Sequence, residues 1–134
     1  SPECAAACLN TSGRGQMGSV QKARLNKTNY FWTNKNAFLW DLSREIEQLK
    51  KRAANQGFKF AVRLNGTSDL AWHKFKVDGG NTLHELHPDV IFYEYTKVLN
   101  YLDHGHKNLN VTFSDSGRND SDIAAAIAKG ANVA

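Results

Sequence analysis

Polar residues that can do chemistry follow three apolar, β-forming stretches of this sequence. The first stretch is FAVRLNGTSD at 60–69, in which an apolar run stops in a cluster of hydrogen-bonding side chains. VIFYEYTK at 90–97 and LNVTFSDS at 109–116 have the same design. Each pattern is typical of a buried strand that ends in a polar loop. If the strands are parallel, their carboxyl ends meet at one edge of the sheet, where α/β proteins bind ligands.

The site predicted at this edge takes its residues from all three strand ends. Asp69 and Glu94 are candidate general acids or bases, and Lys97 is a candidate anion ligand or proton carrier. The candidate substrate-binding residues are Arg63, Asn65, Thr67, Ser68, Thr96, Ser114 and Ser116. Polar groups at buried strand ends bond either to a ligand or to each other. The alternative is that these residues form a polar network that only caps the sheet.

Two arginines are candidates for anion binding. Arg63 lies within the first strand, and a guanidinium pointing into the polar end of a sheet needs a carboxylate or an anionic ligand. A salt bridge to Asp69 or Glu94 is the alternative. Arg14 lies in the loop NTSGRG at 10–15, whose backbone amides can also bind an anion. This loop lacks the Lys-Ser/Thr ending of a nucleotide-binding P-loop.

The two cysteines, Cys4 and Cys8, stand four residues apart in CAAAC. A disulfide fits this spacing poorly, so we expect reduced thiols and a cytoplasmic setting. Two thiolates on one helical face can bind a soft metal or part of an iron–sulfur cluster, if further ligands come from elsewhere. Two small buried cysteines are the alternative.

The histidines show no metal-site pattern. None of them has the paired spacing of a helical zinc site, and most are predicted to lie at the surface. These residues are His73, His84, His87, His104 and His106. The sequence also lacks a GxGxxG motif after a strand, a GxSxG elbow and a helix-turn-helix signature.

The elements that must position the candidate residues alternate along the chain. The strongest helix prediction is 35–55, where apolar residues at helical spacing form one face and charged residues occupy the remaining face. Gly57 is expected to end this helix. Further helices are expected from Ser19 toward Tyr30 and over 123–129. Strands are expected at 58–64, 90–95, 109–113 and from Asn132 on. This order predicts an α/β fold with a mostly parallel sheet and flanking helices, as part of a (βα) barrel.

Size and composition narrow the class of protein. A chain of 134 residues has the length of one domain, and 41% hydrophobic with 22% charged residues exclude wholesale disorder. No apolar run approaches the roughly 20 residues that span a bilayer, so no membrane partner is predicted. The formal charge of +4 permits nucleic acid as a partner without requiring it. Because the chain starts at Ser1 and stops just after a predicted strand start, we expect a piece of a longer protein.

Several motifs together resemble the phage-borne "gene product 88" family. The most specific of them are CLNTSGRG, RLNGTSD and FYEYTK, and the resemblance spans nearly all 134 residues. Family members are longer at both ends, and their amino-terminal motif usually has a further cysteine before the place of Ser1. The family resemblance implies no established activity.

A second resemblance, to radical-SAM-like phage proteins, implies a chemistry. In those proteins a cysteine triad precedes a partial βα barrel whose strands end in comparable polar blocks. Cys4 and Cys8 would then be two of three ligands to a [4Fe–4S] cluster, and the third would lie upstream. Asn65, Ser68 and Thr96 would face S-adenosylmethionine or the substrate. Only CxxxC is present here, where the usual motif is CxxxCxxC, so a non-catalytic remnant is the alternative.

Two main classes of function follow. The first is a phage-encoded radical-SAM-like or iron–sulfur-associated protein that acts on a nucleic acid or a nucleotide-derived substrate in the host cytoplasm. The second is a non-enzymatic protein that binds nucleic acid or a host protein. A zinc-stabilised structural module is a third.

Overall fold

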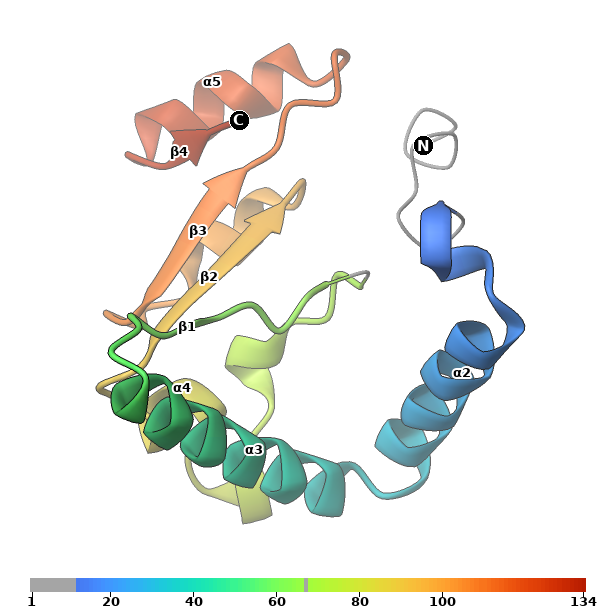
Figure 1. Ribbon diagram of the computed structural model, residues 1–134. Coiled ribbons are helices and arrows are strands. Elements are labelled where there is room, and N and C mark those ends of the chain that lie inside the picture. Colours follow the sequence, from blue (N-terminus) through green and yellow to red (C-terminus); the bar gives the residue numbers. More distant parts are fainter. Residues whose placement is uncertain (1–11, 67) are drawn as a thin grey trace.

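A four-stranded parallel sheet is at the centre of the computed structural model, which describes residues 12–66 and 68–134 (Figure 1). The strands lie side by side in chain order, and each is parallel to its neighbours. They are β1 (Ala61–Val62), β2 (Ile91–Thr96), β3 (Leu109–Phe113) and β4 (Asn132–Val133). The predicted α/β class with a parallel sheet is therefore confirmed.

Two long helices precede the sheet in the chain. They are α2 (Gly18–Thr33) and α3 (Lys35–Asn55). The Asn34 side chain caps the start of α3 by accepting a hydrogen bond from the Ala37 backbone. The remaining helices are α4 (Leu83–Leu86) and α5 (Asp120–Ala128), and the 3-10 helices η1 (Gly13–Gln16), η2 (Trp72–Lys74), η3 (Val77–Gly79) and η4 (Leu99–Asp103).

The prediction for the helix at 35–55 and the strand at 109–113 agrees with the structure residue for residue. The strand predicted at 58–64 is much shorter, since only Ala61 and Val62 pair with β2. The backbone amides of Leu64 and Asn65 donate to the Glu94 carboxylate instead of to a neighbouring strand. This side chain therefore ends β1 early.

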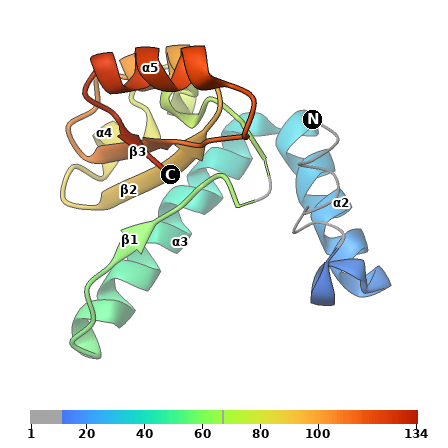
Figure 2. The ribbon, with the colours of Figure 1, turned by 90° about the horizontal axis from the view of Figure 1, so that it is seen from above.

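The helices cover one face of the sheet. On that face Phe92 of β2 and Val111 of β3 pack with Ile46 of α3 and Tyr101 of η4. Crossovers between neighbouring parallel strands are right-handed, so a sequential strand order places the connections on the same face. Figure 2 shows α3 and α5 beside the sheet in this arrangement. The opposite face is not covered by any element between residues 12 and 134 that the structure describes. That the sheet is part of a barrel stays a prediction.

The helix α2 contacts the rest of the molecule mainly through its carboxyl-terminal end, where Tyr30 donates a hydrogen bond to Asp41 of α3 at 2.6 Å. Phe31 is the buried side chain of this helix, and it packs with Leu39, Trp72 and Leu83. The rest of α2 is mostly exposed and points away from the sheet (Figures 1 and 2). A space is therefore left between α2 and the loop that follows β1.

None of the helices in the described part of the chain combines the length and the apolar character needed to cross a bilayer.

Candidate functional site

A buried carboxylate joins the ends of the first two strands. Glu94 is 2% exposed, and its side chain accepts hydrogen bonds from the backbone amides of Leu64 (3.0 Å) and Asn65 (3.1 Å). Burial raises the pKa of the Glu94 carboxyl, and the two amide hydrogen bonds oppose this rise without cancelling it. The candidate acid thus holds the loop that follows β1.

Asn65 organises this loop. Its Oδ1 accepts hydrogen bonds from the Ser68 hydroxyl (2.8 Å), the Leu70 backbone amide (3.0 Å) and Trp72 Nε1 (2.9 Å). Its Nδ2 donates to the Leu70 carbonyl at 2.9 Å. Asn65, Ser68 and Glu94 therefore lie together as predicted, and their described hydrogen bonds join parts of the protein to each other. Contact of these residues with a ligand stays a prediction.

The next two strand ends are also side by side. The Ser114 backbone amide donates to the Thr96 carbonyl at 2.8 Å, and the Thr96 hydroxyl accepts from the Val98 amide at 3.1 Å. Beyond β3, the Ser116 amide donates to Asn119 Oδ1 at 2.9 Å. The Thr96 hydroxyl and the backbone amides of Ser114 and Ser116 thus bond within the chain.

The other predicted site residues are dispersed. The Arg63 guanidinium lies 4.8 Å from the centre of the Tyr95 ring, so its described contact is a cation–π contact rather than the alternative salt bridge to Asp69 or Glu94. Its binding to an anionic ligand stays a prediction. Asp69 and Lys97 are exposed, and Arg14 is exposed on η1. The predictions for Cys4, Cys8 and Thr67 concern positions outside the described residues.

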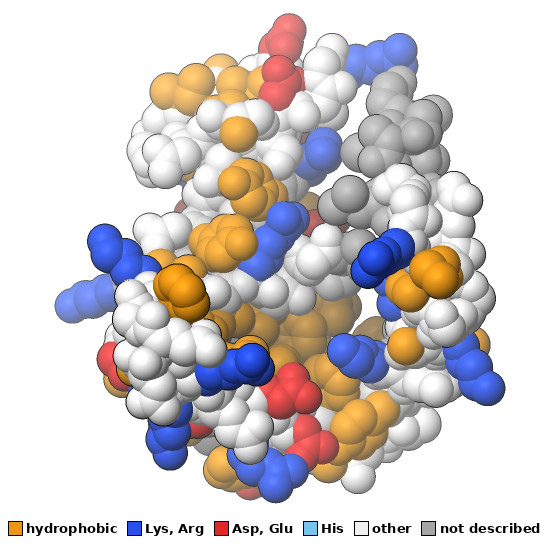
Figure 3. Space-filling model, viewed as in Figure 1, with side chains coloured by type: hydrophobic (Ala, Val, Ile, Leu, Met, Phe, Trp, Pro, Cys, Tyr) orange, Lys and Arg blue, Asp and Glu red, His pale blue; other side chains and the backbone are white. Residues whose placement is uncertain are grey.

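A groove lies between α2 and the loop after β1, and we call it the α2–β1 groove. It encloses about 590 Å³. Its lining is Arg24, Lys27, Thr28, Phe31, Trp32, Phe38, Leu64, Gly66, Ser68, Leu70 and Trp72. Figure 3 shows hydrophobic side chains at the bottom of this hollow, with Lys and Arg side chains around it and Asp or Glu side chains at its lower edge.

Aromatic packing forms the floor of the groove. The Phe31 ring packs edge-to-face on Phe38 (5.4 Å between ring centres) and on Trp72 (5.5 Å). Because the Trp72 indole donates to Asn65, the polar loop after β1 positions this floor. Trp32 is 63% exposed, and Lys35 Nζ lies 5.3 Å from its ring centre.

The segment that builds one wall of the groove is strongly basic. Residues 12–40 include five lysines and arginines and no aspartate or glutamate. The cations are Arg14, Lys22, Arg24, Lys27 and Lys35. Apart from Arg14, sequence reasoning missed the cations of this stretch, although its lack of acidic residues is visible in the sequence. Its charge favours an anionic ligand.

Two histidines correct the prediction that most histidines lie at the surface. His84 is 1% exposed and His87 is 3% exposed. The His84 ring packs against Phe92 (4.5 Å between ring centres) and stacks on His106 (4.9 Å). Within the described part of the chain, neither ring nitrogen of His84 has a hydrogen-bond partner. Burial, followed by the neighbouring His106, lowers the pKa of His84 from 6.5 to about 4.

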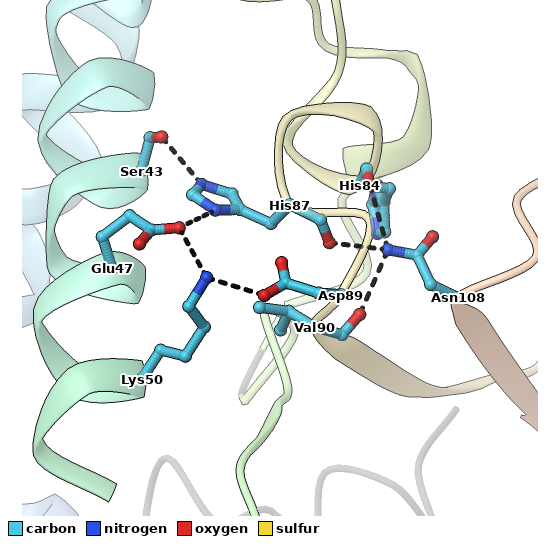
Figure 4. Close-up of polar contacts among 8 residues, drawn as sticks. All are labelled: Ser43, Glu47, Lys50, His84, His87, Asp89, Val90 and Asn108. Atoms are coloured by element: carbon cyan, nitrogen blue, oxygen red, sulfur yellow. Dashed lines mark hydrogen bonds and ion pairs between the residues drawn. The ribbon is translucent and has the colours of Figure 1, made fainter. Parts of the chain in front are cut away.

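His87 connects α3 with the start of β2 (Figure 4). Its Nε2 lies 2.8 Å from the Ser43 hydroxyl, and its Nδ1 lies 2.9 Å from Glu47 Oε1. Lys50 then bonds to Glu47 (3.1 Å) and Asp89 (2.8 Å). Hydrogen bonds from Lys50 and His87 lower the pKa of Glu47.

The order Ser43–His87–Glu47 is that of a hydrolase triad, but the surroundings do not suit catalysis. Ser43 is 8% exposed and belongs to the middle of α3, where backbone amides bond within the helix and cannot form an oxyanion hole. It is not part of the lining of the α2–β1 groove. We interpret this network as a structural connection.

The observations define a parallel-sheet α/β protein with a basic, aromatic groove beside the end of its first strand. The chain belongs to the Gene product 88 family, whose model matches residues 1–134. The predicted resemblance to this phage family is thereby confirmed. Comparison with curated proteins and with solved structures found no significant match.

Replacing Asn65 by alanine should destabilise the protein by about 2–4 kcal/mol, because the Trp72 indole and the Leu70 amide lose a buried acceptor. Urea unfolding followed by tryptophan fluorescence measures this. Ser68→Ala is the control, since Ser68 is exposed and loses one donor, and it should cost less than about 1 kcal/mol. Equal losses in the two variants would contradict the assignment of Asn65 as the organiser of the loop.

Replacing His84 by phenylalanine should remove an acid sensitivity. The pKa of His84 is about 4 in the folded protein and 6.5 for a free histidine. As the pH falls, the unfolded chain therefore takes up a proton at this residue before the folded protein does. The wild type therefore loses roughly 3 kcal/mol of stability from this residue as the pH falls from 6.5 to 4. The free energy of unfolding, measured across this range, should fall less steeply for His84→Phe. Parallel curves for the two proteins would contradict this account.

Proposed function

We propose that this member of the Gene product 88 family binds single-stranded nucleic acid in the α2–β1 groove. The observation that carries the proposal is the pairing of an aromatic floor with a basic wall. Proteins that bind single strands combine such a positively charged groove with aromatic rings on which bases stack. The groove volume of about 590 Å³ is in the range of small-ligand sites, which suits one or a few nucleotides.

Each part of the groove has a role in this proposal. The Lys27 ammonium and the Arg24 guanidinium contact phosphates, and the exposed ring of Trp32 receives a base. The Ser68 hydroxyl and the Gly66 backbone, on the opposite wall, supply hydrogen bonds to the sugar or to a base edge. The loop held by Asn65 and Glu94 supports this wall from inside.

Duplex DNA suits the groove less well. Stacking on a side-chain ring requires a base that is not already stacked in a helix. A host protein is the alternative partner, and the salt dependence of binding separates it from nucleic acid.

We retain the iron–sulfur chemistry as a second proposal. Its support is the CAAAC motif, together with a sheet whose sequential parallel order is that of a barrel wall. Cys4 and Cys8 would supply two cluster ligands, and S-adenosylmethionine or a nucleotide-derived substrate would lie at the strand ends, in the host cytoplasm. Anaerobic reconstitution of a version extended upstream with iron and sulfide, followed by metal analysis, tests this proposal. Absence of bound iron contradicts it.

Charge reversal at Lys27 should weaken binding of a fluorescein-labelled (dT)12 oligonucleotide by about tenfold or more at 0.1 M salt, because the groove loses a cation and gains an anion. Fluorescence anisotropy measures the Kd. The slope of log K against log salt should also fall by about 0.7 for each lost phosphate contact.

The matched control is Lys107→Glu, which makes the same charge change in the turn before β3, at the amino end of the strand. It should bind nearly as the wild type does. Equal weakening in the two variants, or no binding by the wild type, would overturn the proposed site.

A further inference from the structure

None of the described segments covers the face of the sheet away from the helices, and this face has a distinct composition. Along β2, Ile91, Tyr93 and Tyr95 are 54%, 40% and 41% exposed, whereas their neighbours Phe92 and Glu94 are buried. Parallel sheets in α/β proteins normally have both faces covered. We call this surface the open sheet face. Its members are Ala61, Arg63, Ile91, Tyr93, Tyr95, Asn110, Thr112 and Asn132.

The charge of this face is mainly positive. Within the strands themselves, the positions that belong to the face by alternation include no aspartate or glutamate. Arg63 follows β1, and the same alternation adds Lys59 before β1 and Lys97 after β2, all of them exposed. The same alternation reaches Asp89 before β2, and its carboxylate accepts a hydrogen bond from Lys50 of α3 at 2.8 Å. Three cations beside exposed rings outnumber this one paired carboxylate, and this excess complements a chain of phosphates.

The aromatic residues of the face form a stacking platform on a rigid strand. Tyr93 and Tyr95 are two residues apart on β2, with ring centres 6.5 Å apart and planes at 85°. The Arg63 guanidinium lies over the Tyr95 ring at 4.8 Å. Beside them, Asn132 on β4 carries an amide that can bond to base edges, whereas Asn110 on β3 donates through Nδ2 to the Phe92 carbonyl at 3.5 Å.

The open sheet face adjoins the α2–β1 groove. A second hollow, of about 420 Å³, lies between α3 and β1, and its lining includes Ala61 and Arg63. This hollow shares Lys27, Phe38 and Trp72 with the groove. Hydrophobic and basic side chains on this side of the molecule are visible in Figure 3. Arg63 therefore lies between the two surfaces.

We propose that the open sheet face is a second contact area for the same single-stranded nucleic acid, with bases stacked on Tyr93 and Tyr95 and phosphates bound by Arg63 and Lys97. This inference rests on the proposed function, and it adds that the strand crosses β1 after leaving the groove. Exposed tyrosines on a sheet accept unpaired bases of either DNA or RNA, because every base has a π-face.

Photocrosslinking tests binding at the groove and at the open sheet face independently. The full chain is irradiated with oligonucleotides that contain 5-iodouracil, and the crosslinked residues are mapped by mass spectrometry. The proposal predicts crosslinks at Trp32 and also at Tyr93 or Tyr95. Crosslinks at Trp32 alone would overturn the sheet inference and leave the groove standing. Crosslinks at the tyrosines alone would overturn the groove, and no crosslinks would overturn both.

A variant measurement gives a second test. Tyr93→Leu/Tyr95→Leu keeps exposed apolar side chains on β2 but removes the rings, and should weaken (dT)12 binding about tenfold or more. Phe58→Leu is the control, because Phe58 is an aromatic residue that is 69% exposed and lies outside the face. Circular dichroism checks that the variants fold. Unchanged affinity in the folded tyrosine variant, or self-association of the chain that masks these tyrosines, would overturn the inference.

Discussion

The hydrogen bonds from the Leu64 and Asn65 amides to the buried Glu94 carboxylate are the constraint on which the described site depends. A carboxylate at a 2% exposed position is costly unless donors satisfy it. These two amides do so, and β1 therefore ends after Val62. Asn65 is fixed at the same time, and its side chain then holds the Trp72 indole. A strand-end contact thus determines where the aromatic floor of the groove lies.

The residues at the strand ends and the exposed residues of the two proposed binding surfaces have different roles. Asn65 and Thr96 bond within the chain, so they stabilise the fold whether or not a ligand is present. The exposed rings of Trp32, Tyr93 and Tyr95 lie elsewhere, on the groove and on the open sheet face. The basic character of α2 gives the groove its charge. A nucleic-acid ligand fits this division, since it needs cations and exposed rings more than a buried acid.

Local patterns in the sequence predicted the parts of the fold that depend on local physics. The apolar stripe of 35–55 and its stop at Gly57 determine α3, and the β-branched run at 109–113 determines β3. The burial of His84 was not predictable in this way, because it depends on Phe92 and His106, which are distant in sequence. The early end of β1 likewise depends on a residue about thirty positions later. The groove was missed because its floor joins rings from three segments, although the acid-free stretch before Asp41 signals its charge.

The central claim is that the polar strand ends support the fold and that the groove and the open sheet face bind the ligand. An NMR titration of the ¹⁵N-labelled chain with (dT)12 tests this most directly. The account predicts the largest chemical-shift changes at the Trp32 indole, at Lys27 and at the amides of Tyr93 and Tyr95. Largest changes at Asn65, Thr96 and Ser114 would show that the strand ends themselves bind the ligand, and would contradict the account.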